Sequence, residues 1–309
     1  MEMTNVSKGG DFILVGFSEQ PQLEKILFVV VLISYILTLV GNTAIILVSC
    51  LDPKLHTPMY YFLTNLSLID LCFTTSIVPQ LLWKLRGPMK TITPTGCAIQ
   101  LYVSLALGST ECVLLAVMEF DRYAAICRPL HYATVIHPRL CWALVGMAWV
   151  SGLGNTLIQS TITLNLPLCG HRKLYQFMCE VPAMINLACV DIHANEIQLF
   201  MASLVLLFLP LGLILISYAL IAQAVMKIRS AQAWQKALRT CGSHILVTLF
   251  YGTITAVYIQ PNSSYAHRQG KFITLLYTVV TLTLNPLIYT LRNKDMKGAL
   301  KRLLRKDPN

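Results

Sequence analysis

Two ionisable residues, Asp70 and Glu111, lie deepest in the apolar stretches of this sequence. At a rise of ~1.5 Å per helical residue, Asp70 lies about 20 Å beyond Thr57, and Glu111 lies about 24 Å from Cys127. Both carboxyls are therefore expected at one depth in a bundle, where two carboxylates would repel each other. Either a cation lies between them, which we favour, or the acids are neutral and share hydrogen bonds with polar neighbours: Asn42, Ser67 and Asn285.

A second charged group, Asp121-Arg122-Tyr123, follows the apolar run of residues 101–118. Charges there are costly unless they meet water at the membrane surface or pair internally. Arg122 either snorkels from a helix end or pairs with Asp121 in an ion pair that can be broken. Catalytic groupings are not evident, because the sequence has no His-Glu metal set, Ser-His pair or paired mid-membrane aspartates at a workable spacing. We therefore expect that the protein is not an enzyme.

The composition places these groups in a membrane. The chain has 309 residues, of which 55% are hydrophobic and 12% charged, and this is too apolar for an ordinary soluble domain. A membrane helix needs ~20 apolar residues, and the fifth candidate contains Pro210, which is expected to bend it. The sequence therefore predicts an all-α membrane protein, a seven-transmembrane helix bundle, with spans at 25–50, 57–85, 95–127, 139–163, 194–227, 235–260 and 270–291.

The loops between these spans are short, so we expect a single bundle over residues 25–291. An extracellular arm, 1–24, precedes it, and a cytoplasmic amphipathic helix and tail, 292–309, follow and lie on the lipid of the inner leaflet. Most of the 24 Lys and Arg residues fall on the side of the tail, which predicts a plasma-membrane protein with its N-terminus outside. The net charge of +10 then reflects topology, not nucleic-acid binding. The first apolar run, from Ile26, is long enough to remain as a helix instead of a cleaved signal.

Features of the extracellular side agree with this orientation. Four cysteines fall there, in an oxidising compartment, and could pair in three ways: Cys97, Cys169, Cys179 and Cys189. The sequon at Asn5 lies in the polar arm and predicts glycosylation. A similar sequon at Asn262 lies close to the membrane, and its glycosylation is left open.

Small and polar residues at helical spacing, in the half of the bundle on the extracellular side of the two acids, indicate a ligand cavity. Singly, such residues more often serve helix packing, so only their common depth supports a cavity. It would be apolar with a few hydroxyls, which suits a small, neutral, fairly hydrophobic molecule. Helix three offers no acid for an amine there, and helix seven has no mid-membrane lysine for a retinal Schiff base. The lining is expected from Ser104, Leu105, Gly108, Ser109, Cys112, Ala202, Ser203, Leu206, Tyr251, Ile254, Thr255, Tyr258, Leu275, Thr278 and Val279.

Five motifs in order carry a family resemblance. They are LHTPMYYFL at 55–63, MEFDRYAAICRPLHY at 118–132, KALRTCGSH at 236–244, FYGT at 250–253 and NPLIYTLRN at 285–293. With them, residues 11–293 closely resemble the olfactory receptors, a family of rhodopsin-like G-protein-coupled receptors. The resemblance implies an odorant ligand and a stimulatory olfactory-type G protein that raises cyclic AMP. The main alternative, a transporter or channel, would need inverted repeats or broken helices in matching halves, and no internal repeat is seen.

The resemblance also implies roles for particular residues. It pairs Cys97 with Cys179 and Cys169 with Cys189, and it implies a sodium ion at Asp70 and Glu111. Receptors of this family often carry a His three residues before the cysteine matching Cys179, but this chain has Gln176, which argues against a copper or zinc site in that loop. On activation, helix six would swing outward and open a cytoplasmic cleft, with rearrangement of Asp121, Arg122, Tyr123, Tyr218, His244, Asn285, Pro286 and Tyr289.

Overall fold

The structure is a computed structural model of the whole chain. It describes the following parts of it: residues 10–18, 20–87, 90–168, 172–228, 268–275, 278–279, 283–286 and 294–304. The sixth predicted span, 235–260, lies outside the described residues, and the seventh is described in three short pieces.

Five helical segments in the described residues are long and apolar enough to cross a membrane. Four of them begin with a proline in the first turn, where the missing N–H costs nothing. The fifth consists of α7, a π-helical turn and α8, and the π-helical turn ends two residues before Pro210. The predicted irregularity at Pro210 thus includes a change of helix type. The segments are α1 Pro21–Leu51, α2 Pro58–Arg86, α3 Pro94–Cys127, α5 Pro138–Leu164, and α7 His193–Ser203 with η3 Leu204–Phe208 and α8 Leu209–Ile228.

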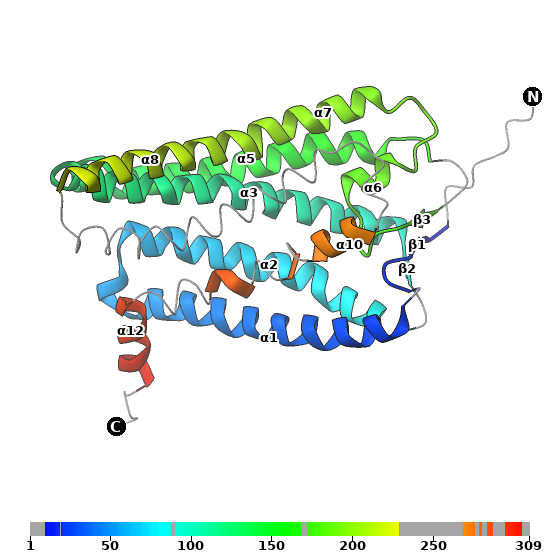
Figure 1. The fold of residues 1–309 in the computed structure, drawn as a ribbon, viewed down its shortest axis with the longest axis horizontal. Helices are drawn as coiled ribbons and strands as arrows, with labels where there is room; N and C mark the ends of the chain where they lie inside the picture. The colour runs from blue at the N-terminus through cyan, green and yellow to red at the C-terminus, as the bar shows by residue number, and fades with distance from the viewer. Residues whose placement is uncertain are drawn as a thin grey trace, which may run out of the picture.

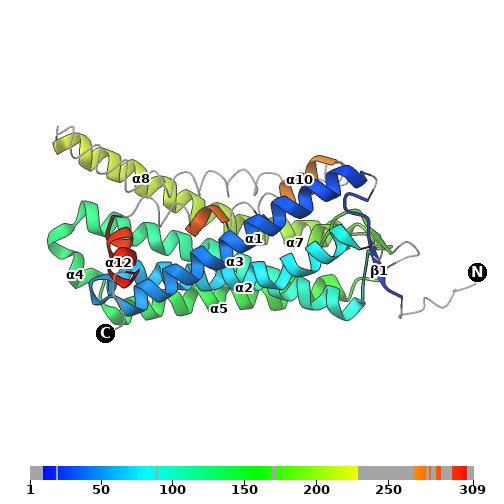
Figure 2. The same cartoon turned by 90° about the horizontal axis from the view of Figure 1, so that it is seen from below.

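The long helices run side by side, with α3 among the others (Figures 1 and 2). This helix packs against α2, α5 and α8, while α1 packs against α2. Large apolar side chains such as Val40, Trp142 and Val150 point outward and are exposed. An exposed apolar surface of this kind is expected of helices that face lipid.

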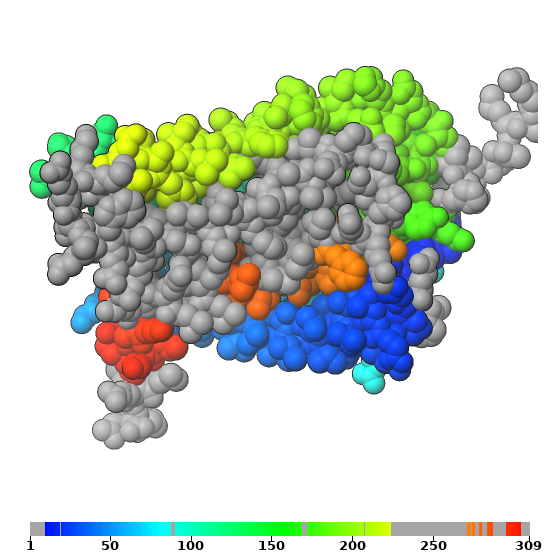
Figure 3. Space-filling model, in the orientation of Figure 1, coloured from blue at the N-terminus to red at the C-terminus, as the bar shows by residue number. Residues whose placement is uncertain are grey.

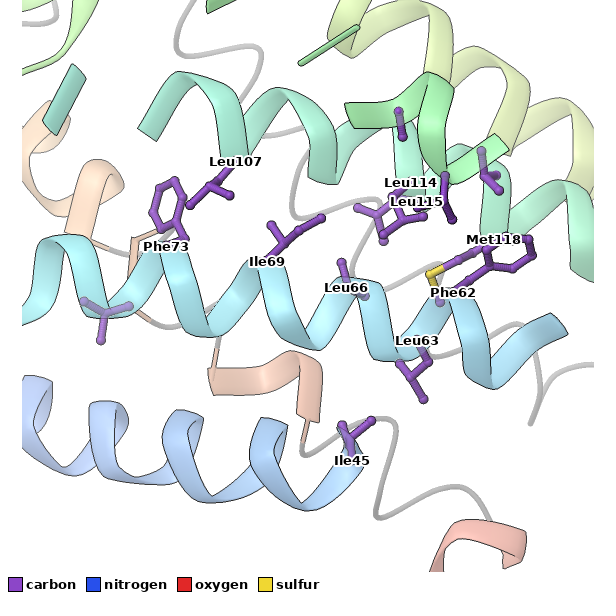
Figure 4. Close-up of a cluster of buried hydrophobic side chains, with 14 of the residues drawn as sticks. Ile45, Phe62, Leu63, Leu66, Ile69, Phe73, Leu107, Leu114, Leu115 and Met118 are labelled. Carbon is purple, nitrogen blue, oxygen red and sulfur yellow. The ribbon is translucent and has the colours of Figure 1, made fainter. Parts of the chain in front are cut away.

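The core between α2 and α3 is built from apolar side chains at helical spacing (Figure 4). Phe73 of α2 faces Leu107 of α3, and Phe62 lies beside Met118 nearer the end of the bundle at which α2 begins. All four side chains are buried. Apolar packing therefore extends above and below the depth of the two acids.

A three-stranded sheet covers the end of the bundle at which α1 begins. Its strands are β1 Phe12–Leu14, β2 Thr91–Ile92 and β3 Lys173–Leu174, and β1 lies between the other two. The arm is thus paired with the segment between α2 and α3 and with the segment that follows α5, antiparallel to β2 and parallel to β3. The first helix begins at Pro21, slightly before the predicted arm ends.

Aromatic contacts fasten this sheet to the bundle. The ring of Phe17 lies 6.4 Å from that of Phe177 and 5.1 Å from that of Phe272, between ring centroids. Phe272 belongs to α10, Arg268–Leu275, and Lys271 of that helix donates from Nζ to the Gly16 carbonyl at 2.7 Å. In the space-filling view, α10 lies against the extracellular end of α1 (Figure 3).

Short elements complete the connections between the long helices. At the end of the bundle where α1 ends these are η1 Pro53–Leu55, η2 Pro129–His131 and α4 Tyr132–Val135, and at the other end α6 Val181–Ile185.

The amphipathic helix predicted for the tail is α12, Lys294–Leu304. Met296 and Ala299 are buried and belong to the main apolar core. Asp52, just after α1, accepts two hydrogen bonds from Arg302: one from Nη2 and one, at 3.1 Å, from Nε. The Arg302 hydrogen bond, followed by that from the Lys54 amide, lowers the pKa of Asp52 below its usual value. The pair therefore stays charged at neutral pH and fixes α12 to the loop between α1 and α2.

Close contact between α3 and α5 depends on Gly152. A Cβ added there would lie 2.8 Å from the Ala106 carbonyl oxygen and 2.9 Å from the Thr110 nitrogen, and closer still to the Thr110 hydroxyl. Such backbone contacts cannot relax without separating the helices. Gly154, on the same helix, has nothing within 4 Å of its added Cβ.

We expect Gly152→Ala to destabilise the purified receptor by ~1–3 kcal/mol through overpacking. Gly154→Ala should be neutral or slightly stabilising, because alanine is the better helix former. Thermal unfolding in detergent, with surface level in cells as a second measurement, checks this. Equal unfolding temperatures for the two variants would contradict the close α3–α5 contact.

Candidate functional site

The amide of Asn285 joins the two deep carboxyls. Its Nδ2 donates to Asp70 Oδ2 at 3.2 Å and to Glu111 Oε1 at 3.4 Å. All three side chains are buried, with at most 3% of the surface of each exposed. The structure therefore brings Asp70 of α2 and Glu111 of α3 to one depth, as the residue count predicted, and adds a shared donor from helix seven.

Asn42 differs from its expected role. As a polar neighbour of two neutral acids it would share a hydrogen bond with them, but its amide donates to the Thr38 carbonyl of its own helix at 3.2 Å. The side chain of Thr38 in turn contacts that of Thr283 at 3.0 Å, which joins α1 to helix seven. A helix can satisfy an asparagine donor from its own backbone one turn earlier, and sequence spacing cannot distinguish that from a contact between helices.

Three buried amide and carboxyl oxygens in this region have no hydrogen-bond partner in the described structure. They are Oδ1 of Asn42, Oδ1 of Asp70 and Oδ1 of Asn285. Buried oxygens without donors are costly. Oxygen atoms of these types are also the ligands that hard cations such as sodium prefer.

Near the end of α3, Asp121 accepts a hydrogen bond from the Tyr132 hydroxyl at 2.7 Å. Burial, followed by the hydrogen bond to Asp121, raises the pKa of Tyr132, which lies in the connection between α3 and α5. Asp121 itself is 3% exposed. The last tyrosine of the 118–132 motif thus holds its aspartate, whereas the pairing of Asp121 with Arg122 stays a prediction.

Glu119 is a candidate functional residue that the sequence did not single out. Its Oε1 accepts a hydrogen bond from the Tyr218 hydroxyl of α8 at 2.7 Å, and its side chain is 1% exposed. Tyr218 also packs with Tyr123 around Ile221. The sequence does show a glutamate two residues before Asp121, but it does not show the partner, because Tyr218 lies 99 residues further along the chain.

The predicted disulfide between Cys97 and Cys179 is confirmed, with 5.5 Å between the Cα atoms. Gln100 supports it: its Oε1 accepts from the Cys179 amide at 2.9 Å, and its Nε2 donates to Gln80 of α2 at 3.1 Å. The loop between α5 and α7 is therefore fixed to both α2 and α3. Cys189 is disulfide-bonded, while Cys169 lies outside the described residues.

The described residues predicted to line a ligand cavity are partly buried or buried. Ser109 accepts a hydrogen bond from Asn155 of α5 at 2.9 Å, and so contributes to helix packing. Ser203 donates to the Leu199 carbonyl at 2.8 Å. The hydroxyl oxygen of Thr278, in helix seven, lies 3.7 Å from the sulfur of Met178, in the loop between α5 and α7. Several predicted residues lie outside the described residues: Asn5, His244, Tyr251, Ile254, Thr255, Tyr258 and Tyr289.

Comparison with known proteins identifies the chain's relatives. A family profile described as "Olfactory receptor" matches residues 31–307. Human olfactory receptor 2G3 is 59% identical over 98% of this chain and 99% of its own length. Human olfactory receptor 2H1 is 58% identical over 99% of this chain and 97% of its own length. Mouse olfactory receptor 2C1 is 59% identical over 99% of this chain and 98% of its own length.

The chain belongs to the olfactory receptor family. Membership confirms the predicted seven-transmembrane fold class, to which the five described apolar spans conform. This olfactory receptor is an odorant-sensing G-protein-coupled receptor in a membrane that it crosses several times, and it is not an enzyme. The alternative of a transporter or channel is thereby excluded.

Proposed function

We propose that this olfactory receptor binds small, neutral, fairly hydrophobic volatile molecules within its helix bundle. In the proposed function, it activates a stimulatory olfactory-type G protein and raises cyclic AMP. The match to olfactory receptors over almost the whole chain carries this proposal. The residues expected to contact the odorant are those listed above from helices three, five, six and seven.

The proposed orientation places the N-terminus outside the plasma membrane and the tail inside. In support, the disulfide Cys97–Cys179 lies at the end of the bundle that carries the sheet, as oxidising surroundings require. The exposed Lys297 and Lys301 of α12 lie at the other end, where anionic lipid would attract them. Glycosylation of Asn5 belongs to the same proposal.

In the proposed activation step, odorant binding shifts the population toward a conformation with an open cytoplasmic cleft, into which the G protein inserts its terminal helix. Tyr218 must then leave Glu119, because the 2.7 Å hydrogen bond holds its hydroxyl against α3. Arg122 must likewise turn away from Asp121, which accepts the Tyr132 hydroxyl. The Tyr218–Glu119 hydrogen bond therefore stabilises the resting arrangement.

The proposal includes a sodium ion at Asp70 and Glu111. The Oδ1 atoms of Asn42, Asp70 and Asn285, which lack donors, support it. So does the proximity of two carboxyls, which a cation would neutralise. Bound there, the ion would supply positive charge and oxygen coordination between α2, α3 and helix seven.

The experiment that tests the proposed function measures cyclic AMP in transfected cells exposed to a panel of volatile compounds. We expect at least one neutral, apolar compound to raise cyclic AMP in a dose-dependent way. Arg122→Ala should abolish the response at unchanged surface level, because it removes the group proposed to couple to the G protein. A receptor present at the surface that answers no compound, or an Arg122→Ala variant that signals normally, would refute it.

We expect Glu119→Ala to raise odorant-independent cyclic AMP about two- to tenfold, the change expected when the resting state loses one hydrogen bond. Glu119→Gln keeps an acceptor for Tyr218 and should stay near the wild-type level. The measurement is basal cyclic AMP, normalised to surface receptor. Equal basal signalling by all three proteins would show that the Glu119–Tyr218 bond does not restrain activation.

A further inference from the structure

Lys84 is the one buried basic side chain among the described residues, with 6% of its surface exposed. Its Nζ has no hydrogen-bond partner in that part of the chain. Other basic groups at this end of the bundle do have oxygen partners. Lys90 pairs with Glu24, Lys271 donates to the Gly16 carbonyl, and Arg172 donates to a backbone carbonyl. Lys84 is therefore a cationic group that the described protein leaves unsatisfied.

The position of Lys84 on α2 directs it into the bundle. It continues the buried face of this helix, which runs through Asp70, Thr74, Ile77 and Leu81 at spacings of three and four residues. At Asp70 this face meets Asn285 of helix seven. Lys84 follows Asp70 by about four turns, roughly 21 Å toward the extracellular end.

Two residues close to Lys84, on the outer face of α2, have exposed side chains. Trp83 is 75% exposed, and Arg86 is exposed with its guanidinium 5.9 Å from the centre of the Phe28 ring. A lysine this close to a helix end ordinarily snorkels to water. Lys84 instead lies on the inner face.

The loop that carries Cys179 is fixed close to this part of α2. Gln80, one turn below Lys84, accepts the Gln100 hydrogen bond, and Gln100 also holds the Cys179 amide. Cys179 and its neighbours Phe177 and Met178 are all buried. Lys84 Nζ is itself buried, so it depends on partners inside the bundle.

Burying a cation without an acceptor is costly, and an anion in contact with it offsets much of that cost. An intramembrane ionisable residue is accordingly a candidate for ligand contact. Because Lys84 has only donors to offer, its complement is an oxygen acceptor, and a carboxylate satisfies both its charge and its hydrogen bonds.

We infer that Lys84 binds the carboxyl group of a small organic acid, which makes volatile acids a ligand class of this receptor. The inference rests on the proposed function and narrows it. Such an acid is small, neutral when protonated and apolar along its chain. When a neutral acid reaches a neutral amine, the carboxyl proton moves from oxygen to Nζ and leaves a carboxylate–ammonium pair. When Nζ already carries that proton, the carboxylate binds directly.

The test compares butanoic, hexanoic and nonanoic acids with their methyl esters and the corresponding alcohols. Cyclic AMP is measured for the wild type and for Lys84→Met, which keeps an unbranched side chain without the charge. We expect the acids to be the more potent ligands of the wild type. Lys84→Met should raise their half-maximal concentrations about tenfold or more, as loss of a charged hydrogen bond requires. Responses to the esters should change less than about threefold.

Two variants serve as controls for this test. Lys84→Arg keeps a cation and should retain the preference for acids. Arg86→Met removes an exposed cation two residues away and should leave responses to acids unchanged, so a general effect of surface charge is distinguishable. If Lys84→Met responds to acids as the wild type does, or if Arg86→Met loses the response equally, the inference is wrong.

A binding measurement separates this inference from the proposed signalling. A ligand that binds the folded state raises its unfolding temperature, so purified full-length receptor is heated with each acid. We expect the acids to stabilise the wild type and Lys84→Arg but not Lys84→Met. If the acids stabilise the receptor but do not raise cyclic AMP, the Lys84 site is upheld and the proposed coupling to the G protein is overturned. If no acid stabilises the wild type, the Lys84 site is refuted whatever the signalling result.

Discussion

One amide inside the membrane, that of Asn285, contacts the carboxyls of Asp70 and Glu111 and so joins helix seven to α2 and α3. Polar groups in hydrocarbon must find partners within the protein. The helices therefore cannot slide or rotate freely past one another without exposing a carboxyl to apolar surroundings. The apolar packing of Phe73 against Leu107 is consistent with the same relative position of α2 and α3.

The two ends of the bundle are held by different sets of contacts. The end that carries the sheet is fixed by a disulfide, a three-stranded sheet and the aromatic contacts of Phe17, none of which a change of protonation would release. At the other end the Arg302–Asp52 ion pair fixes α12, while α3 is held by single hydrogen bonds from Tyr132 to Asp121 and from Tyr218 to Glu119. Single hydrogen bonds cost less to break, which suits the proposed opening of this end for a G protein.

The sequence was sufficient to predict features that depend on spacing and composition. The apolar spans follow from length, the common depth of Asp70 and Glu111 follows from the helical rise, and the Cys97–Cys179 disulfide followed from family resemblance. Features that depend on helix rotation and side-chain rotamers were not predictable. Asn42 bonds its own helix, and Glu119 finds Tyr218 across a contact between helices. A single sequence does not specify these choices, because each polar group had more than one partner within reach.

The central claim is that the cluster of Asp70, Glu111 and Asn285 binds a cation that stabilises the bundle. Its most direct test is the unfolding temperature of the purified receptor as sodium replaces N-methylglucamine at constant ionic strength. Because a ligand of the folded state stabilises it by an amount that grows with the logarithm of its concentration above the dissociation constant, we predict a rise with sodium in the wild type. Asp70→Asn should show no such rise. A wild type that is insensitive to sodium, or a variant that responds equally, would contradict the claim.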